Sequence, residues 1–329
     1  MNEKLEVTAD NSRQASESYF RRALEDWRQY VIYLGFIVIF IFFSLTLSEK
    51  GFLDPNNLLN IVRQTAMIAI MAVAMTFVLS AGEIDLAVGA VAGLVSVTTA
   101  MAFAKFGLIG GIFGGILTGI VVGLINGLLT TRVGIPSFLV TLAMMGIARG
   151  SAMWISNTAA IPILDRTYYF SFGSGNIGPV PVLLVWALIV AVIGHIALRK
   201  TTFGRKALAT GGNETAARFT GIKTQNIKLQ VLIISSIAAA IAGMLYAGRL
   251  RSGRFQLGEG DELSVIAAAV LGGTSLFGGF GSVVGSIVGA LMIGLINNGL
   301  ILMGLEFSQQ LIARGVIIIL AVTVARSRR

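Results

Sequence analysis

The sequence predicts an all-α polytopic membrane protein with about ten transmembrane helices and both termini in the cytoplasm. Three observations support this prediction. Hydrophobic residues make up 55% of the 329 residues and charged residues only 12%, a balance typical of multi-span membrane proteins. Apolar stretches long enough to cross a bilayer recur from Tyr30 onward. Most of the 25 Lys and Arg lie in the polar stretches that would then be cytoplasmic.

The apolar stretches divide the chain into a membrane domain and two polar tails. Residues 1–29 form a cytoplasmic N-terminal tail, residues 30–325 the transmembrane domain, and residues 326–329 a basic cytoplasmic tail. The first apolar stretch begins too late for a cleaved signal peptide and is expected to be an anchor. We expect spans near residues 30–48, 58–80, 86–105, 107–131, 136–157, 180–199, 228–249, 262–277, 281–304 and 308–325. The stretch 262–277 is brief for a span and is expected to be broken or re-entrant.

The residue types that are missing exclude several kinds of site. The chain has no Cys, which excludes disulfides and thiolate sites, and its one His, His195, is expected at the membrane interface. No G-x-x-x-x-G-K-[ST] motif is present, so P-loop ATP hydrolysis is not expected on this chain. The glycine-rich stretch 278–285 has the wrong spacing for a dinucleotide fingerprint. We therefore expect neither catalytic residues nor a metal site, and the basic charge at segment ends does not indicate nucleic-acid binding.

The polar loop at residues 200–228 lies between two long apolar segments and is rich in Lys and Arg. The positive-inside rule puts it in the cytoplasm. Its centre has the pattern of a very short helix, because Asn213 is a suitable N-cap, Glu214 suits the positive end and Gly221 suits the stop. A helix this short is not stable alone in water. It needs a surface to dock on, which indicates a soluble cytoplasmic partner.

Glycine recurs every four residues in two of the apolar stretches. This spacing lines one face of a helix with small residues, so that another backbone can approach closely. Ordinary intramembrane packing explains the pattern, and a sliding interface used in transport is the alternative. The glycines are Gly107, Gly111, Gly115, Gly119, Gly123 and Gly127 in the first stretch and Gly281, Gly285 and Gly289 in the second.

Glu83 and Asp85 lie in a short break between two apolar stretches. An unpaired carboxylate at membrane depth is costly, so each must reach water, a helix end or a partner. In one interpretation the break is a turn, where Gly82 stops one helix and Asp85 accepts from the backbone amides of the next. In the other, the break lies beside the translocation path, where irregular backbone is tolerated because it lines a cavity. Both interpretations can hold together.

Four further polar residues lie within apolar stretches and are candidates for the same path. Arg149 is expected to snorkel toward the outer interface, with a carboxylate partner or a place on the path as the alternative. Asn126, Asn297 and Asn298 are explained by hydrogen bonds between helices, with contacts to sugar hydroxyls as the alternative.

Two polar stretches, residues 158–179 and 250–261, are expected on the outer face. The second carries the charged residues Arg251, Arg254, Glu259 and Asp261. These are either solvated loop charges or a docking face for an extracytoplasmic protein.

Three segments together resemble a known family. They are LSAGEIDLAVGAV (Leu79–Val91), TTFGRKALATGGNETAARFTGI (Thr201–Ile222) and ELSVIAAAVLGGTSLFGGFGSVVGSIVGALMIGLINNGL (Glu262–Leu300). The chain resembles the membrane permease subunits of bacterial ATP-binding-cassette (ABC) importers for monosaccharides, the branch that includes ribose, arabinose, xylose and galactose permeases. The likeness covers nearly the whole chain from Tyr30 and is nearest to the ribose type.

The resemblance implies a multi-pass permease of the bacterial cytoplasmic membrane, which is not itself an enzyme and binds no cofactor. ATP and Mg would be bound by a cytoplasmic ABC ATPase with two cassettes. An extracytoplasmic sugar-binding protein and a second permease copy would complete the importer, as a homodimer or a heterodimer. The loop around Gly211–Gly221 would be the ATPase-coupling segment, although Thr215 departs from the family's Glu-Ala-Ala pattern. The docking role transfers to Gly212, Asn213, Glu214, Ala217, Arg218 and Gly221.

The expected mechanism is alternating access, in which the ATPase closes on ATP and moves the docked helix. An ion-coupled secondary sugar transporter is the alternative, and it would need an intramembrane ionisable relay, for which only Glu83 and Asp85 are candidates. Ribose is the leading substrate by resemblance, with xylose, galactose, arabinose and inositol left open.

Overall fold

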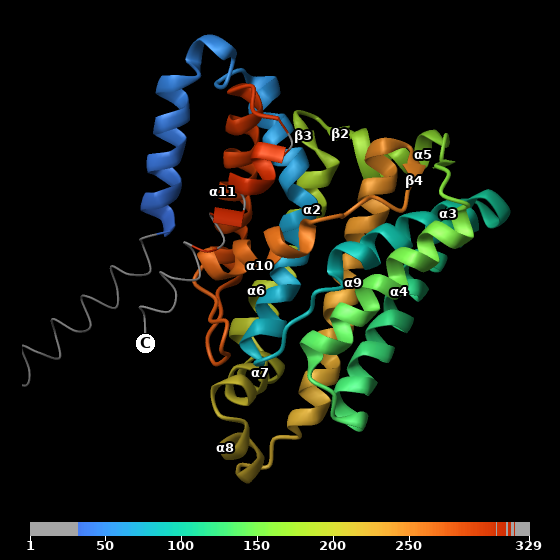
Figure 1. Cartoon of the computed structure of the whole chain (residues 1–329), viewed down its shortest axis with the longest axis vertical. Coiled ribbons are helices and arrows are strands. Elements are labelled where there is room, and N and C mark those ends of the chain that lie inside the picture. Colours follow the sequence, from blue (N-terminus) through green and yellow to red (C-terminus); the bar gives the residue numbers. More distant parts are fainter. Residues whose placement is uncertain (1–31, 307, 314, 317–318, 320–329) are drawn as a thin grey trace, which may run out of the picture.

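The computed structural model of the chain describes residues 32–306, 308–313, 315–316 and 319 (Figure 1). Six helices in this part are long and apolar enough to cross a membrane. They are α2 (Pro55–Ser80), α3 (Val88–Leu128, continued by the π-helical η2, Leu129–Val133), α4 (Ser137–Ser156), α6 (Val182–Lys200), α9 (Thr224–Leu250) and α11 (Val283–Leu302). The prediction of an all-α polytopic membrane protein is confirmed.

The remaining elements are short. The shorter helices are Ile32–Thr46, α5 (Arg166–Tyr169), α7 (Thr202–Gly212), α8 (Glu214–Phe219), α10 (Asp261–Leu271), the 3₁₀ turn η1 (Ser48–Lys50) and the π-helical η3 (Phe170–Ser174). The strands are two antiparallel pairs, β1 (Ile161–Pro162) with β4 (Ser252–Gly253) and β2 (Asn176–Ile177) with β3 (Val180–Pro181).

Six spans are fewer than the ten expected, and the difference has three sources. The expected spans at 30–48 and 262–277 correspond to helices too short to cross alone, since the 11 residues of α10 extend only about 16 Å. The expected spans at 86–105 and 107–131 are counted together as the one long helix α3, although the chain doubles back between them at Gly107, where the boundary was expected. The last expected span, 308–325, is described only in part, and both tails (1–29 and 326–329) lie outside the described residues.

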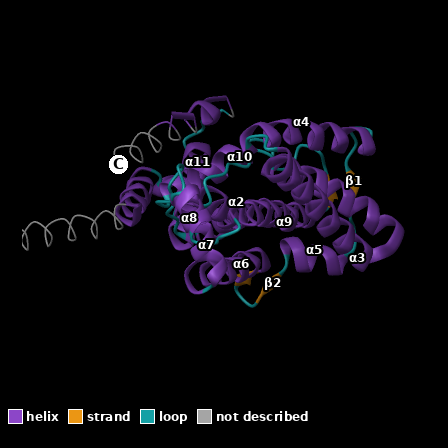
Figure 2. Cartoon of the chain, turned by 90° about the horizontal axis from the view of Figure 1, so that it is seen from below, coloured by secondary structure: helices purple, strands orange, loops and turns teal. Residues whose placement is uncertain are grey.

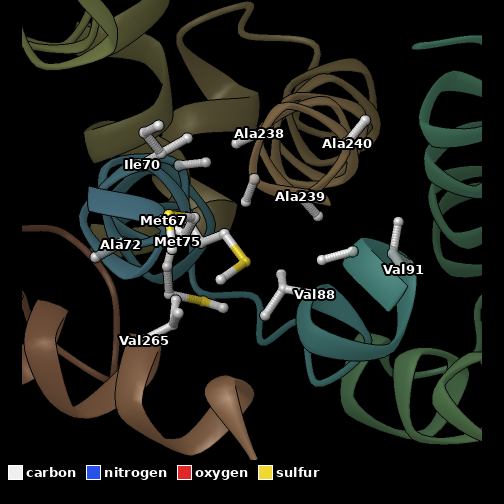
Figure 3. Packing of buried hydrophobic residues seen from close by; sticks show 14 of the residues in the cluster. Met67, Ile70, Ala72, Met75, Val88, Val91, Ala238, Ala239, Ala240 and Val265 are labelled. Atoms are coloured by element: carbon white, nitrogen blue, oxygen red, sulfur yellow. The ribbon is translucent and has the colours of Figure 1, made fainter. Parts of the chain in front are cut away.

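The helix α2 forms the centre of the molecule. Asp54 caps its first turn by accepting from the backbone N–H of Asn56 at 2.7 Å, and Pro55 supplies a preset N1 backbone. From Thr65 to Ser80 every residue is buried, as expected for a helix that is apolar on all sides. Figure 3 shows Met67, Ile70 and Met75 of α2 among side chains from α9, α3 and α10. Seen from below, α2 and α9 lie between α4 and α6 (Figure 2).

The 41 residues of α3 form two helical parts that double back on each other. Gly107 has φ 69° and ψ −162°, a conformation that an L side chain rarely adopts. Beyond this kink, Thr118 donates to the hydroxyl of Thr98 at 3.0 Å, and a Cβ at Gly115 would lie 2.4 Å from the Thr99 hydroxyl oxygen. Gly107 is therefore the corner of a helical hairpin rather than part of a packing stripe.

The later glycines of that series let α3 approach α9 closely. A Cβ added to Gly119 would lie 2.7 Å from the Ala240 Cβ and 2.8 Å from the Ser236 carbonyl oxygen. Gly123 and Gly127 meet α9 in the same way, which confirms the expected small-residue face for this part of the helix. In the second series, a Cβ at Gly289 would lie 2.1 Å from the Ala268 carbonyl oxygen of α10.

The polar connections separate to two ends of the molecule. The helices α7 and α8 lie at the lower end in Figure 1, and α5 with the β1–β4 and β2–β3 pairs lies at the upper end. The loop 200–228 is therefore on the opposite side from the loops 158–179 and 250–261, as the predicted topology requires.

We expect Gly119→Ala to lower the apparent unfolding temperature of the purified protein in lipid, because the added methyl must displace α9, at a cost of about 1–3 kcal/mol. Gly146 of α4 is the matched control, since no atom lies within 4 Å of a Cβ built there. Gly146→Ala should be neutral or stabilising. Equal unfolding temperatures for the two variants would contradict the close α3–α9 packing.

Candidate functional site

The short helix predicted within loop 200–228 is present as α8. The Asn213 side chain accepts from the backbone N–H of Ala216 at 2.9 Å, Glu214 lies in the first turn, and Gly221 has φ 84° just beyond the end. The cap and stop are therefore confirmed. Only Ala217 of α8 is buried, so one small residue faces the rest of the protein.

The exposed face of α8 carries a large apolar side chain. Phe219 is 87% exposed and lies at the end of the molecule formed by α7 and α8 (Figure 1). Thr215, Ala216 and Arg218 are exposed beside it. A phenyl ring this exposed offers apolar area that a protein partner could bury favourably. The sequence motif did not single out Phe219 as a site residue, although an aromatic in an otherwise polar loop was a usable signal.

An ion-pair network joins α8 to the start of α9 and to the break after α2. The Lys228 Nζ lies 2.9 Å from the Glu214 Oε2 and 2.7 Å from the Glu83 Oε1. Glu214 also accepts from Arg218 and from the Thr224 hydroxyl. Burial by itself raises the pKa of the Glu214 carboxyl, but the bonds and charge of Lys228, with Arg218 and Thr224, lower the pKa below its usual value. Glu214 is thus held ionised at neutral pH.

The break at residues 81–87 has most of its polar groups satisfied by neighbouring helices. The Ile84 N–H donates to the Ser137 hydroxyl at 3.1 Å, and the Leu86 N–H donates to the Thr141 hydroxyl at 3.0 Å, both on α4. Asp85 Oδ1 accepts from the Ala87 N–H at 2.9 Å. These amides have no carbonyl partner within a helix, and the hydroxyls of α4 accept their hydrogen bonds instead.

The turn interpretation is confirmed for Gly82, but the prediction that Asp85 caps the next helix is wrong, because α3 has no side-chain cap. Gly82 has φ 79° and ends the helical path, as expected. Asp85 bonds the amide of the N-cap residue Ala87 itself rather than amides within α3. Glu83, whose partner the sequence did not identify, is paired with Lys228. A Lys at the first turn of an apolar segment was the available signal for that pair.

Three backbone segments meet at the α7–α8 end without room for side chains. The Gly279 N–H donates to the Ser80 carbonyl at 3.0 Å. A Cβ on Gly211 of α7 would lie 2.0 Å from the same Ser80 oxygen, and one on Gly278 would lie 2.4 Å from the Gly211 oxygen. The end of α7 therefore touches both the break after α2 and the non-helical segment 272–282 between α10 and α11.

Asn297 and Asn298 lie away from Glu83 and Asp85. Asn298 and Asn57 exchange two amide hydrogen bonds, at 2.8 and 3.1 Å, near the opposite end of α2, which is about 39 Å long. Asn297 is half-buried next to Asn298. Asn126 is buried in α3, and neither of its amide atoms has a protein partner within the described part of the chain.

The charged residues of the outer stretch 250–261 have partners within the chain. Arg149 of α4 pairs with Glu259 at 3.1 Å, and Arg251 lies over the Tyr169 ring at 4.3 Å from its centroid. Arg254 Nε donates to the Ser252 hydroxyl at 2.9 Å, and Asp261 accepts from the Tyr246 hydroxyl. Arg251, Arg254 and Glu259 are nevertheless exposed at this end of the molecule.

No group of three or more His, Asp or Glu among the described residues is placed to hold a metal ion.

The family model and the curated relatives are both permeases of transport systems, described for amino acids in the first case and for sugars in the second. Residues 57–322 match the family model for the permease component of branched-chain amino acid transport systems. The ribose import permease protein RbsC of Bacillus subtilis is 40% identical over 298 residues, covering 90% of this chain and 92% of the relative. The L-arabinose ABC transporter permease protein AraH of Azospirillum brasilense is 37% identical over 303 residues, covering 90% and 88%. No solved structure matches the chain.

We expect Asn213→Ala to speed hydrogen exchange of the α8 amides about fivefold, because loss of an N-cap costs about 1 kcal/mol. Asn226→Ala is the matched control, because Asn226 is exposed in the first turn of α9 and this helix has no side-chain N-cap hydrogen bond. Unchanged exchange in residues 214–220 of the Asn213 variant would show that the cap does not stabilise α8.

Proposed function

Because the chain belongs to the permease-component family of branched-chain amino acid transport systems, we propose that it is the membrane permease of an ABC importer that carries a monosaccharide by alternating access. A ribose-like pentose is the leading substrate. The ribose and arabinose permeases among the relatives, each aligned over about nine-tenths of its length, support a sugar over an amino acid.

The single observation that carries the proposal is the exposed helix α8. It presents Phe219, 87% exposed, at the end opposite the β1–β4 pair, and it is held from behind by Ala217 and the Glu214 ion pairs. A cytoplasmic ATPase with two cassettes would receive this face, centred on Gly212, Asn213, Glu214, Ala217, Arg218 and Gly221. ATP and Mg would bind to that partner, because the permease sequence has no P-loop motif.

The mechanism follows from linkage. If ATP binds more tightly to the closed ATPase dimer, the difference in binding free energy drives the permease toward the conformation to which that dimer fits. The permease then needs only a weakly binding path for the sugar. High affinity would lie in an extracytoplasmic binding protein, for which the exposed Arg251, Arg254 and Glu259 are the candidate docking residues together with Asp261.

A second copy of the chain would complete the path. The exposed apolar side chains of α3 and α4, such as Phe113, Ile147 and Trp154, face outward and suit lipid or a neighbouring permease. A homodimer is the simplest arrangement, because one chain type supplies both docking helices for two cassettes.

The ion-coupled secondary transporter is the weaker alternative. It would use Glu83 or Asp85 as the titrating group of a relay. Glu83, however, is already engaged in an ion pair with the Lys228 ammonium at 2.7 Å, which gives it a structural partner rather than a free place in a relay.

We expect the purified permease with its ATPase, in lipid, to hydrolyse ATP faster when a binding protein loaded with its sugar is added. The panel would contain ribose, arabinose, xylose and galactose with their binding proteins. Stimulation by one pair identifies the substrate, because only the matched binding protein engages the outer face. Sugar uptake that persists without any ATPase would contradict the proposal and favour the ion-coupled alternative.

We expect Phe219→Ser to weaken ATPase association about thirtyfold, because truncating a central aromatic of an interface costs about 2 kcal/mol or more. The affinity would be measured between permease in nanodiscs and the isolated ATPase. Phe170→Ser is the matched control, since Phe170 is an exposed aromatic at the opposite end of the molecule. Equal affinities for the two variants would show that α8 is not the docking surface.

A further inference from the structure

Lys228 holds two carboxylates that belong to different parts of the structure. Its Nζ lies 2.9 Å from the Glu214 carboxylate of α8 and 2.7 Å from the Glu83 carboxylate of the break after α2. The Lys228 and Glu83 side chains are only 17% and 8% exposed. The described part of the chain shows no other ion pair between α8 and the interrupted segments of the membrane domain.

We propose that Lys228 is a positioning residue that transmits movement of the docked helix α8 to the unwound segment 81–87. This inference rests on the proposed function, because it assigns the route by which ATPase closure reaches the interior. The docking residue Glu214 and the path candidate Glu83 do not contact each other directly, and Lys228 connects the two.

The link at the α8 side is stiff. Glu214 is fixed by Arg218 of the same helix and by the Thr224 hydroxyl, in addition to Lys228. Arg218 Nε also donates to the Thr224 hydroxyl at 3.1 Å. Helix α8 and the first turns of α9 are therefore cross-linked by charged hydrogen bonds, which are shorter and stronger than neutral ones. A displacement of α8 displaces the Lys228 ammonium.

The link at the membrane side is equally defined. Glu83 is followed by residues whose backbone amides bond the Ser137 and Thr141 hydroxyls of α4. The segment is thus suspended between α9, through Lys228, and α4, through two hydroxyls. In a site this buried, screening by solvent is weak, so the ion pair resists separation far more than an exposed pair does.

An independent contact acts on the same segment. The end of α7 lies against Ser80 and Gly278 with no space for a side chain at Gly211. The α7–α8 unit therefore meets the break after α2 directly through the Gly211 backbone and indirectly through Lys228 of α9, which pairs with Glu214. Movement of this unit as one body would change the relative position of the segment 81–87 and of α4. The ion pair resists separation of the two parts as well as compression. The backbone contact at Gly211 resists only compression.

The test compares the ratio of stimulated to basal ATP hydrolysis in the reconstituted permease–ATPase complex for several variants. Lys228→Met removes both ion pairs and should abolish the stimulation, so that the stimulated rate falls to the basal rate while the ATPase still co-purifies. Lys228→Arg keeps the charge and should restore most of the stimulation. Lys206→Met is the matched control, because Lys206 is an exposed lysine of α7 at the same end of the molecule.

The double variant Glu83→Gln with Lys228→Met separates transmission from mere stability. The single Lys228 variant leaves the Glu83 carboxylate buried without its partner, which destabilises the fold, whereas the double variant removes both charges. We expect the double variant to unfold at nearly the wild-type temperature and still to lack stimulation. Recovery of stimulation along with stability would overturn the proposal, because Lys228 would then serve only the fold.

Two further outcomes separate this inference from the function on which it rests. If the wild-type complex is stimulated by a loaded binding protein and Lys228→Met is stimulated equally, the relay is wrong and the importer stands. If no loaded binding protein stimulates the wild-type complex, the importer is wrong, and the relay is overturned with it.

Discussion

Backbone polar groups that leave a helix inside a membrane must find partners within the protein, and this constraint governs the interrupted parts of the fold. The segment 81–87 meets it with the hydroxyls of Ser137 and Thr141. The segment 272–282 meets it with the Ser80 carbonyl, which accepts from Gly279, and with the Thr274 hydroxyl, which accepts from the Ser282 N–H at 3.3 Å. Each interruption is thereby tied to helices distant in the sequence, so neither can move independently of its neighbours.

Small residues allow the close backbone contacts between these segments. Gly211, Gly278 and Gly279 bring three backbones into direct contact, and Gly119 and Gly123 do the same between α3 and α9. Dispersion forces between closely packed backbones replace the hydrophobic effect, which supplies little association energy among helices in lipid. The glycine content of the chain is therefore a structural requirement, and it leaves the helices without large interlocking side chains at these contacts.

Three of the four ion pairs among the described residues join separate elements of the fold. Glu83, Lys228 and Glu214 form a chain of ion pairs from the break after α2 to the docking helix, and Arg149 with Glu259 joins α4 to the outer loop. The first set lies at the proposed ATPase side and the second at the proposed binding-protein side. In a protein with so few charged residues, these pairs connect the two surfaces to the helices between them.

The sequence alone determined the membrane class, the short helix with its Asn213 cap and Gly221 stop, and the turn at Gly82, because these depend on composition or on residues a few positions apart. The family was indicated by the resemblance of three segments to known permeases. The tertiary structure decided what depends on distant segments. It gave Asn298 a partner in Asn57 and joined Glu83 to Lys228. Periodicity reports which residues share a helix face, but it carries no information on which faces meet. That is set by the close fit of the whole bundle.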